Sequence, residues 1–317
     1  MKKQELFPAD QEYFWRNVLK YLNQITEIRI RVEKPVILYL NQKELSLDEN
    51  GEFLYYIENG YRFTYKEMQK LIDFWCMDSR YAFQEEIKKG YLTIKDGHRI
   101  GICGEVVKES GKLQSIKYIS SLNIRIAHEI EGVANSIIED IYIKDKVANT
   151  LIISPPGAGK TTLLRDIVRL LSDGIEGKNG KNVAVVDERG EIAACYQGIP
   201  QLKVGSRTDI LVGCDKEQGL RMLLQSMAPE VIAVDEIVTE KEQMLIREMM
   251  GRGCGVIATM HGEDKIDVRK DKKWYEGFEI IIFLGKDREK FISKVYRLEE
   301  RERCKNFWEQ YLLLRDF

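Results

Sequence analysis

Residues 151–162 read Leu-Ile-Ile-Ser-Pro-Pro-Gly-Ala-Gly-Lys-Thr-Thr, and this stretch decides the fold. Its first residues are apolar enough for a buried strand, its glycines favour a tight turn, and Gly-Lys-Thr opens a helical pattern. This order suits phosphate binding, because backbone N–H groups converge on phosphate oxygens where a helix N-terminus favours negative charge. The stretch predicts a nucleotide-binding domain. The alternative is a glycine-rich turn that holds no phosphate.

The same loop assigns the expected cofactors, ATP and Mg²⁺. Lys160 is expected to reach the β- and γ-phosphates, and the Thr161 hydroxyl is expected to bind Mg²⁺. Ser154 stands where the motif G-x-x-x-x-G-K-[ST] has its first glycine, and a small serine still permits the turn. The predicted nucleotide-binding residues are Ser154, Pro155, Pro156, Gly157, Ala158, Gly159, Lys160, Thr161 and Thr162.

Two acidic segments follow the loop, each at the end of an apolar run. In residues 229–237, Asp235 is expected to meet the Mg²⁺ shell through water and Glu236 to polarise the attacking water. In residues 185–191, Glu188 lies one strand–helix unit after the loop, which predicts a place beside the γ-phosphate. Solvated strand ends are the alternative interpretation of these carboxylates.

Two more residues are candidates for contact with the γ-phosphate. His261 ends the run 256–261 and suits a polar sensor at a strand end, although a lone histidine usually has no such role. Arg207 lies between the two acidic segments in the sequence. It is a candidate arginine finger, because phosphoryl transfer is accelerated by an arginine on the γ-phosphate.

The pattern of the chain changes near residue 145. After that point apolar strand-like runs alternate with helical runs, which predicts a parallel sheet covered by helices. The strands are expected at 150–154, 182–187, 230–235 and 255–259, and the helices at 161–171, 218–227 and 241–251.

The earlier part predicts a small α+β domain with an antiparallel sheet. Residues 27–32 alternate as a half-buried strand does, and Thr64 and Glu67 have the spacing of a capping box before a helix. We expect an N-terminal α+β domain at 1–131, a linker at 132–149 and the ATPase domain at 150–317. Residues 132–146 of the linker are expected to form a helix and a connector. Further expected elements are a helix at 83–89, strands at 91–95, 98–107 and 113–127, and a turn at Asp96-Gly97.

Composition narrows the class of protein. The 317 residues carry 49 Lys+Arg against 51 Asp+Glu, a net charge of −2, which argues against a chain-wide field that holds nucleic acid. Six cysteines without a C-x-x-C pair predict no zinc site or disulfide scaffold and a reducing, cytoplasmic compartment. The longest apolar runs are strand-sized, below the roughly 18 residues of a membrane span, and the start does not resemble a signal peptide.

These segments together resemble the secretion-superfamily ATPases of type II and type IV systems and of pilus motors. Those proteins carry a phosphate loop, an acidic box, a second acidic strand and a histidine box in this order, and here Gly-Glu-Asp follows His261. One branch is more similar still, the stage III sporulation AA family of endospore formers. The segments that carry this similarity are 27–32, 90–94, 97–107, 119–127, 185–193 and 204–220.

The resemblance implies an α/β fold with a RecA-like P-loop NTPase core, preceded by a smaller α+β domain. It implies a Mg²⁺-dependent ATPase that energises or assembles a membrane transport channel between mother cell and forespore during endospore formation. The expected partners are further copies of the chain, as a hexamer, and membrane proteins of the channel. The expected location is the mother-cell cytoplasm, peripheral at the membrane, and no nucleic-acid partner is expected.

In the related motors, arginines of the N-terminal domain act on the nucleotide across the cleft or the subunit interface. By position, Arg99 and Arg125 match them best, and ordinary exposed strand arginines are the alternative. Val238 departs from the family pattern, because a glycine usually follows the acidic pair and its isoleucine. Gln225 stands where an arginine is common.

Three other functions stay open at this point. A nucleotide-gated scaffold with little turnover would use ATP only to set a conformation, and Val238 keeps this alternative open. A nucleic-acid-dependent ATPase uses a similar fold, but the balanced charge and the lack of an aromatic and basic stripe weigh against it. A metabolite kinase would need an acceptor pocket, of which the sequence shows no signature.

Overall fold

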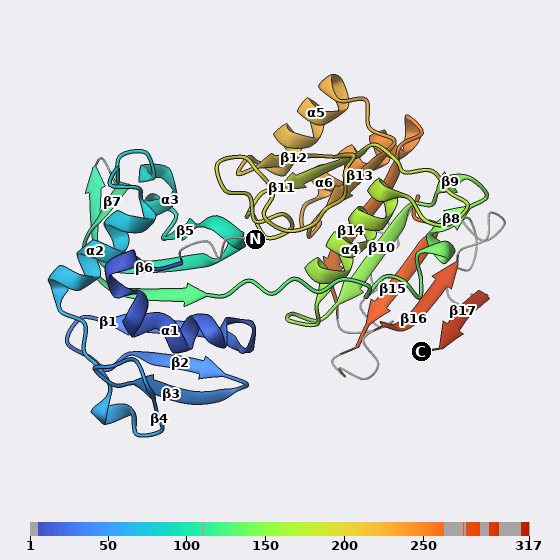
Figure 1. Cartoon of the computed structure of the whole chain (residues 1–317). Helices are drawn as coiled ribbons and strands as arrows, with labels where there is room; N and C mark the ends of the chain where they lie inside the picture. Colours follow the sequence, from blue (N-terminus) through green and yellow to red (C-terminus); the bar gives the residue numbers. More distant parts are fainter. Residues whose placement is uncertain are drawn as a thin grey trace. The chain divides into compact units, whose positions relative to one another are not determined.

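The computed structural model describes residues 6–109, 111–262, 275, 277–285, 292–297 and 312–316 (Figure 1). The chain forms two compact units. The first runs to His128 and also includes Ala194–Gln201, whereas the second comprises Glu129–Ala193 and the described residues from Leu202 onward. Nothing in the sequence pattern separates residues 194–201 from their neighbours, so this assignment was not foreseen.

The first unit is built on an antiparallel sheet, as the sequence predicts. Its strand order is β4-β3-β2-β1-β7-β6-β5, and all neighbouring pairs are antiparallel. The strands are β1 (Ile25–Arg31), β2 (Ile37–Leu40), β3 (Lys43–Leu47), β4 (Phe53–Leu54), β5 (Tyr91–Thr93), β6 (Arg99–Glu109) and β7 (Lys112–Arg125). The helices are α1 (Glu12–Lys20), α2 (Tyr65–Trp75) and α3 (Gln84–Lys88), with 3₁₀ turns η1 (Ala9–Gln11), η2 (Leu22–Gln24), η3 (Ile57–Asn59) and η4 (Lys95–Gly97).

Local signals in the sequence explain these elements. Ile28 and Ile30 of β1 are fully buried in the core of this unit, whereas the alternate residue Arg29 is half-buried. The capping box of α2 is confirmed, because the Thr64 hydroxyl accepts the Glu67 N–H at 3.3 Å and the Glu67 carboxylate accepts the Thr64 N–H at 2.8 Å. These two bonds satisfy N–H groups that the helix itself leaves unpaired.

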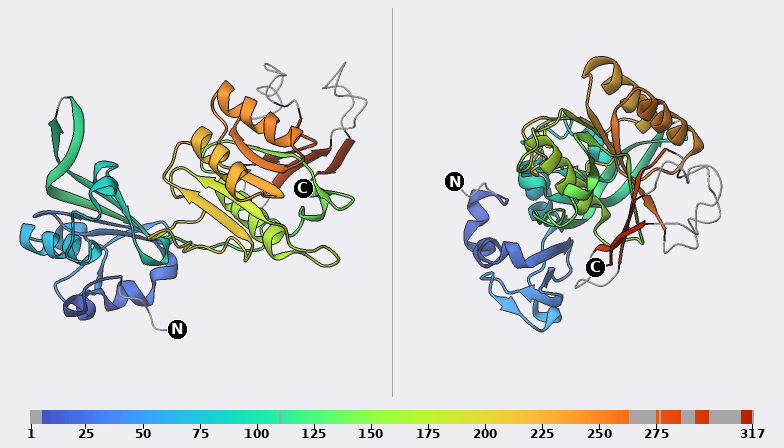
Figure 2. Two further views of the ribbon diagram at one scale, coloured as in Figure 1. Left: turned by 90° about the horizontal axis from the view of Figure 1, so that it is seen from above. Right: turned by 90° about the vertical axis from the view of Figure 1, so that its right-hand side faces the viewer.

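Strands β6 and β7 continue beyond the sheet as a two-stranded ribbon (Figure 2). Pairing of β1 with β7 stops at Ser121, but β6 stays paired with β7 as far as Glu109 opposite Lys112. The predicted Asp96-Gly97 turn leads into β6, and both residues have positive φ, +61° and +78°. Asparagine, aspartate and glycine are the residues that accept this backbone conformation at low cost.

The second unit contains the parallel sheet that the sequence predicts. Its strand order is β12-β11-β13-β14-β10-β15-β16-β17, parallel from β12 to β15 and antiparallel from there to β17. The strands are β10 (Thr150–Ser154), β11 (Val183–Asp187), β12 (Thr208–Val212), β13 (Val231–Val234), β14 (Gly255–His261), β15 (Ile280–Leu284), β16 (Ile292–Arg297) and β17 (Leu312–Asp316). The helices are α4 (Lys160–Asp173), α5 (Lys216–Ser226) and α6 (Glu240–Gly251).

Both faces of this sheet are covered. Every residue of β10, β11 and β13 is buried, which a parallel sheet between helical layers requires. Leu220 of α5 and Ile246 of α6 share one core cluster with Ile153 of β10. The chain moves along the sheet from β10 to β11 and returns from β12 to β14, so right-handed connections place α4 on the opposite face from α5 and α6.

The prediction of a helix within residues 132–146 of the linker is wrong. Ala134, Ile137 and Ile141 are buried at helical spacing, but the backbone forms successive turns in which Ile137 N–H bonds to the Ala134 carbonyl three residues back. Tight turns and an α-helix give nearly the same apolar period, so the pattern cannot separate them. The segment contains η5 (Glu139–Ile141) and the hairpin of β8 (Tyr142–Ile143) and β9 (Lys146–Val147). No helix in the described parts of the chain has both the length and the apolar character of a bilayer span.

Candidate functional site

The glycine-rich loop joins β10, which ends at Ser154, to α4, which begins at Lys160. Gly157 and Gly159 have φ of +75° and +88°, a region that residues with a Cβ disfavour. Gly159 is the N-cap of α4, so the unpaired N–H groups of the first helical turn lie next to the loop. The loop therefore has the backbone that phosphate binding needs.

Four strand ends bring the predicted polar residues to one edge of the second unit's sheet. Strands β10, β11, β13 and β14 run parallel, so their carboxyl ends lie at the same edge. Asp187 ends β11, Asp235 and Glu236 follow β13, and His261 ends β14 directly beside Ser154 of β10. This edge is where open α/β sheets bind their ligands.

Lys160 points into this edge with most of its side chain buried. Its Nζ lies 3.3 Å from Nε2 of His261, and only 8% of the residue is exposed. Burial lowers the pKa of the Lys160 ammonium, while the carboxylates of Asp235 and Glu236 act in the opposite direction. A phosphate group at the loop would supply further negative charge to this ammonium.

Thr161 and Asp235 are in direct contact. The Thr161 hydroxyl donates to one oxygen of Asp235 at 3.0 Å, and the Thr259 hydroxyl donates to the other at 2.8 Å. A hydroxyl beside a carboxylate fits Mg²⁺, which prefers oxygen ligands and usually keeps several waters and substrate phosphates in its shell. Within the described residues no three His, Cys, Asp or Glu side chains are grouped so that they could hold a metal ion by themselves.

Glu236 adopts an unusual backbone conformation beside Asp235. Its φ is +48°, in the left-handed region, and its N–H donates to the Thr259 hydroxyl at 2.8 Å. Its carboxylate lies 3.3 Å from Nε2 of His261 and 3.9 Å from the Arg189 guanidinium. Strained residues of this kind cluster at functional sites.

The other acidic pair divides into two roles. Asp187 is buried and accepts the N–H groups of Glu191, Ile192 and Ala193 at 2.8 Å, 3.0 Å and 2.9 Å, so it shapes the turn after β11. Burial raises the pKa of Asp187, against the effect of these three bonds. The carboxylate of the predicted residue Glu188 is half-exposed and lies 3.3 Å from Nζ of Lys216.

Arg207, a candidate arginine of the same unit, does not lie at this edge. The Arg207 guanidinium donates to the Ser172 carbonyl at 3.0 Å, in the last turn of α4 and at the opposite end of that helix from the loop. Arg207 is therefore no finger for the site of its own chain. Arg99 and Arg125 are cross-strand partners in the first unit, with the Arg99 guanidinium 3.6 Å from the centre of the Tyr91 ring. Their role at a nucleotide stays a prediction.

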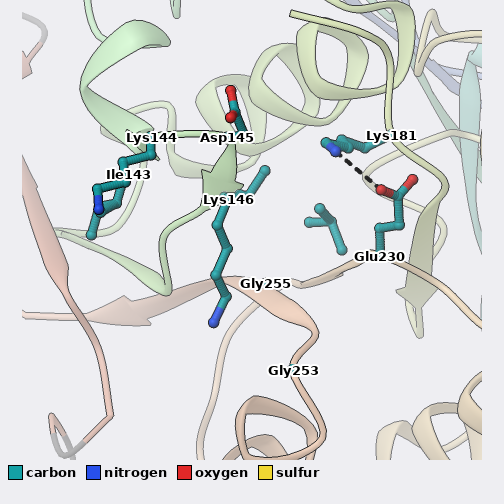
Figure 3. A pocket seen from close by; sticks show the side chains of 10 residues that line it. Ile143, Lys144, Asp145, Lys146, Lys181, Glu230, Gly253 and Gly255 are labelled. Carbon is teal, nitrogen blue, oxygen red and sulfur yellow. Dashed lines mark hydrogen bonds and ion pairs between the residues drawn. The ribbon is translucent and has the colours of Figure 1, made fainter.

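A cavity of about 630 Å³ lies elsewhere in the second unit (Figure 3). It is bordered by Lys181 and Glu230, which form an ion pair at 3.1 Å, and by the hairpin of β8 and β9. Val231 and Gly255 on its wall begin β13 and β14, so the cavity lies at the amino ends of the strands. It is separate from the edge that carries the phosphate loop.

Comparisons with known proteins show the family of the chain. The family model "Sporulation stage III, protein AA" matches residues 11–296. The chain belongs to the stage III sporulation protein AA family. The family's protein from Bacillus subtilis (strain 168) is 39% identical over 247 residues, which cover 78% of this chain and 76% of that protein.

Solved structures give the fold. The Legionella pneumophila ATPase DotB has a TM-score of 0.56 at 13% identity, covering 96% of this chain and 84% of DotB. The pilus retraction motor PilT, solved with ADP, has a TM-score of 0.53 at 15% identity, covering 85% and 77%. The predicted family resemblance is confirmed, and so is the α/β fold with a RecA-like core and an additional N-terminal domain. Glu263 and Asp264 of the histidine segment lie outside the described residues.

Two residues that contact the site, Thr259 and Lys216, were not predicted from the sequence. Thr259 links Asp235 to the Glu236 backbone, yet it resembles any polar residue in an apolar strand. Lys216 is 8% exposed in the first turn of α5, where the helix dipole disfavours a cation. A lysine directly after the N-cap Asp215 was a signal that some acidic partner lies nearby.

Proposed function

We propose that the chain hydrolyses ATP with Mg²⁺ at the carboxyl edge of its parallel sheet. The observation that carries this proposal is the chain of contacts Lys160–His261–Glu236 and Thr161–Asp235 beside the glycine-rich loop. The loop and the contacts lie at the ends of three different strands, β10, β13 and β14, and each side chain has the type that phosphoryl transfer uses.

The residues then divide the chemistry among themselves. The N–H groups of residues 157–162 bind the phosphates, and Lys160 neutralises charge on the β- and γ-phosphates. Mg²⁺, when bound, stabilises the developing charge, and Thr161 and Asp235 are placed to hold it. Glu236 orients and polarises the attacking water, with His261 beside it. Glu188 is placed beside the γ-phosphate in this proposal.

We place this activity in the transport machinery of endospore formation. ATP turnover energises or assembles a membrane channel between mother cell and forespore, with the protein as a hexamer in the mother-cell cytoplasm, peripheral at the membrane. Its partners are membrane proteins of the channel, and Arg99 and Arg125 serve as fingers for the nucleotide. Family membership and a fold shared with an ATPase and a pilus motor support this proposal.

The scaffold alternative receives no support from Val238. The Val238 N–H donates to the Glu242 carboxylate at 2.7 Å, so the residue forms part of the start of α6, and this bond needs no glycine. Intact Glu236 and Glu188 at the site favour turnover.

Steady-state ATP hydrolysis tests the proposal. We expect Mg²⁺-dependent turnover by the wild type, abolished in Lys160→Ala, and a kcat about 10²–10⁴-fold lower in Glu236→Gln, because a general base contributes that much. A fluorescent ATP analogue should bind to Glu236→Gln as it does to the wild type. The scaffold would be established instead if the wild type binds ATP without hydrolysing it and Glu236→Gln binds ATP with the same affinity.

A further inference from the structure

Lys216 is a buried cation for which the loop chemistry has no use. It lies in the first turn of α5, behind the N-cap Asp215, where neither burial nor the helix dipole favours an ammonium. Three oxygens compensate for this. Its Nζ lies 2.7 Å from the Glu236 carbonyl, 3.3 Å from the Glu188 carboxylate and 3.7 Å from the Glu242 carboxylate.

The shortest of these contacts, from Lys216 to the Glu236 carbonyl, holds a residue with a strained backbone. Glu236 has a φ of +48°, a conformation that a residue with a Cβ keeps only where its surroundings hold it. Its N–H is held by the Thr259 hydroxyl at 2.8 Å, and its carbonyl accepts from Lys216. Both backbone polar groups of Glu236 are therefore anchored, which fixes the direction in which its side chain leaves the backbone.

The other two contacts extend the anchor to neighbouring elements. Glu188 follows β11, whereas Glu236 follows β13, so one ammonium joins the two acidic strand ends. Glu242 also accepts the N–H groups of Val238 and Thr239 at 2.7 Å and 2.9 Å, at the start of α6. Loss of Lys216 would remove the cation that these two carboxylates and the Glu236 carbonyl share, and these groups repel one another.

We infer that Lys216 is a positioning residue, which holds Glu236 and Glu188 in the geometry needed for attack of water on the γ-phosphate. The inference rests on the proposed ATP hydrolysis and assigns to Lys216 no contact with the nucleotide. A displacement of about 1 Å in a catalytic group is enough to cost a factor of about 10² in rate. Removing the anchor is therefore expected to lower kcat and to leave nucleotide affinity alone.

The test compares Lys216→Met, Lys216→Arg and the wild type in steady-state ATP hydrolysis and in binding of a fluorescent ATP analogue. In Lys216→Met we expect kcat to fall about 10²-fold with KM and analogue affinity within about twofold of the wild type. Lys216→Arg, which retains the charge and the donors, should recover at least tenfold of that loss. The matched control is Lys181→Met, which removes a lysine paired with Glu230 at the other edge of the sheet and should keep the wild-type kcat.

The outcomes separate the two proposals. Wild-type turnover that is lost in Lys160→Ala establishes the proposed function, and an unchanged kcat in Lys216→Met then overturns only the role of Lys216. Weakened analogue binding with an unchanged kcat would also overturn it, since Lys216 would then act on the nucleotide. If Lys216→Met fails to fold, Lys216→Gln replaces it, with the same kcat-selective loss expected. Absence of wild-type turnover overturns both proposals.

Discussion

His98 is a buried histidine whose protonation is linked to folding. Its Nδ1 accepts the Ala127 N–H at 3.1 Å, and burial lowers its pKa, while Asp96 acts to raise it. The unfolded chain binds a proton near pH 6.5 and the folded chain only at lower pH, so stability is lost as pH falls below about 6.5. We expect the free energy of unfolding to fall between pH 7.5 and pH 5.5, measured by urea denaturation.

His98→Asn is the control for that slope. Asparagine keeps an acceptor near the Nδ1 position but does not titrate, so the slope between pH 7.5 and pH 5.5 should be smaller than in the wild type. Equal slopes in the two proteins would mean that His98 titrates alike in the folded and unfolded chains. His128 and His261 are present in both proteins and cancel in the comparison.

Single residues were predictable where a motif fixes their spacing. Lys160, Thr161, Asp235 and Glu236 were found because the loop and the apolar strand define their places, and the structure brings these four together. Lys216 was not found, because its partners follow β11 and β13 or lie in α6, and the spacing of residues in the sequence does not show that these segments contact one another. Contacts between distant segments are what a single sequence leaves out.

At the scale of elements, the capping box of α2 carries a stability prediction. Thr64→Ala removes the side-chain acceptor of the Glu67 N–H, which typically costs about 1 kcal/mol. The buried residues Met68, Leu71 and Ile72 keep the helix on the core, so the protein should stay folded. Urea denaturation measures the loss, and Thr64→Ser, which retains the acceptor, should recover most of it. A loss of equal size in both variants would contradict the role of the cap.

Other elements show why the sequence prediction was incomplete. The helices at α4, α5 and α6 were expected because amphipathic periodicity over three turns is a strong signal. Strand β12 was missed because its apolar run, residues 210–212, is only three residues long, and its residues are half-buried or exposed at the edge of the sheet. The linker at 132–149 misled the prediction, since turns with buried residues at Ala134 and Ile137 imitate a helical period.

The whole molecule was predictable as an architecture. Two units with an antiparallel and a parallel sheet follow from two different apolar patterns. The assignment of residues 194–201 to the first unit was not predictable, because it depends on packing of a segment with no apolar period. The turn shaped by Asp187 leads directly into this segment, since Ala193 is the last of its N–H donors.

The proposed oligomer gives a prediction for the whole molecule. If Arg125 acts on the nucleotide of a neighbouring copy, Arg125→Ala should lower kcat about 10³-fold or more, as loss of an arginine finger does, and specific activity of the wild type should rise with protein concentration. Arg125→Ala and Glu236→Gln are then expected to restore turnover when mixed, because mixed rings contain sites with an intact Glu236 from one copy and an intact Arg125 from the next.

Arg29→Ala, at another arginine of the same sheet, is the control and should keep wild-type activity. Activity in the mixture no greater than the sum of the two variants alone, together with wild-type specific activity that is flat on dilution, would show that Arg125 is not shared between copies.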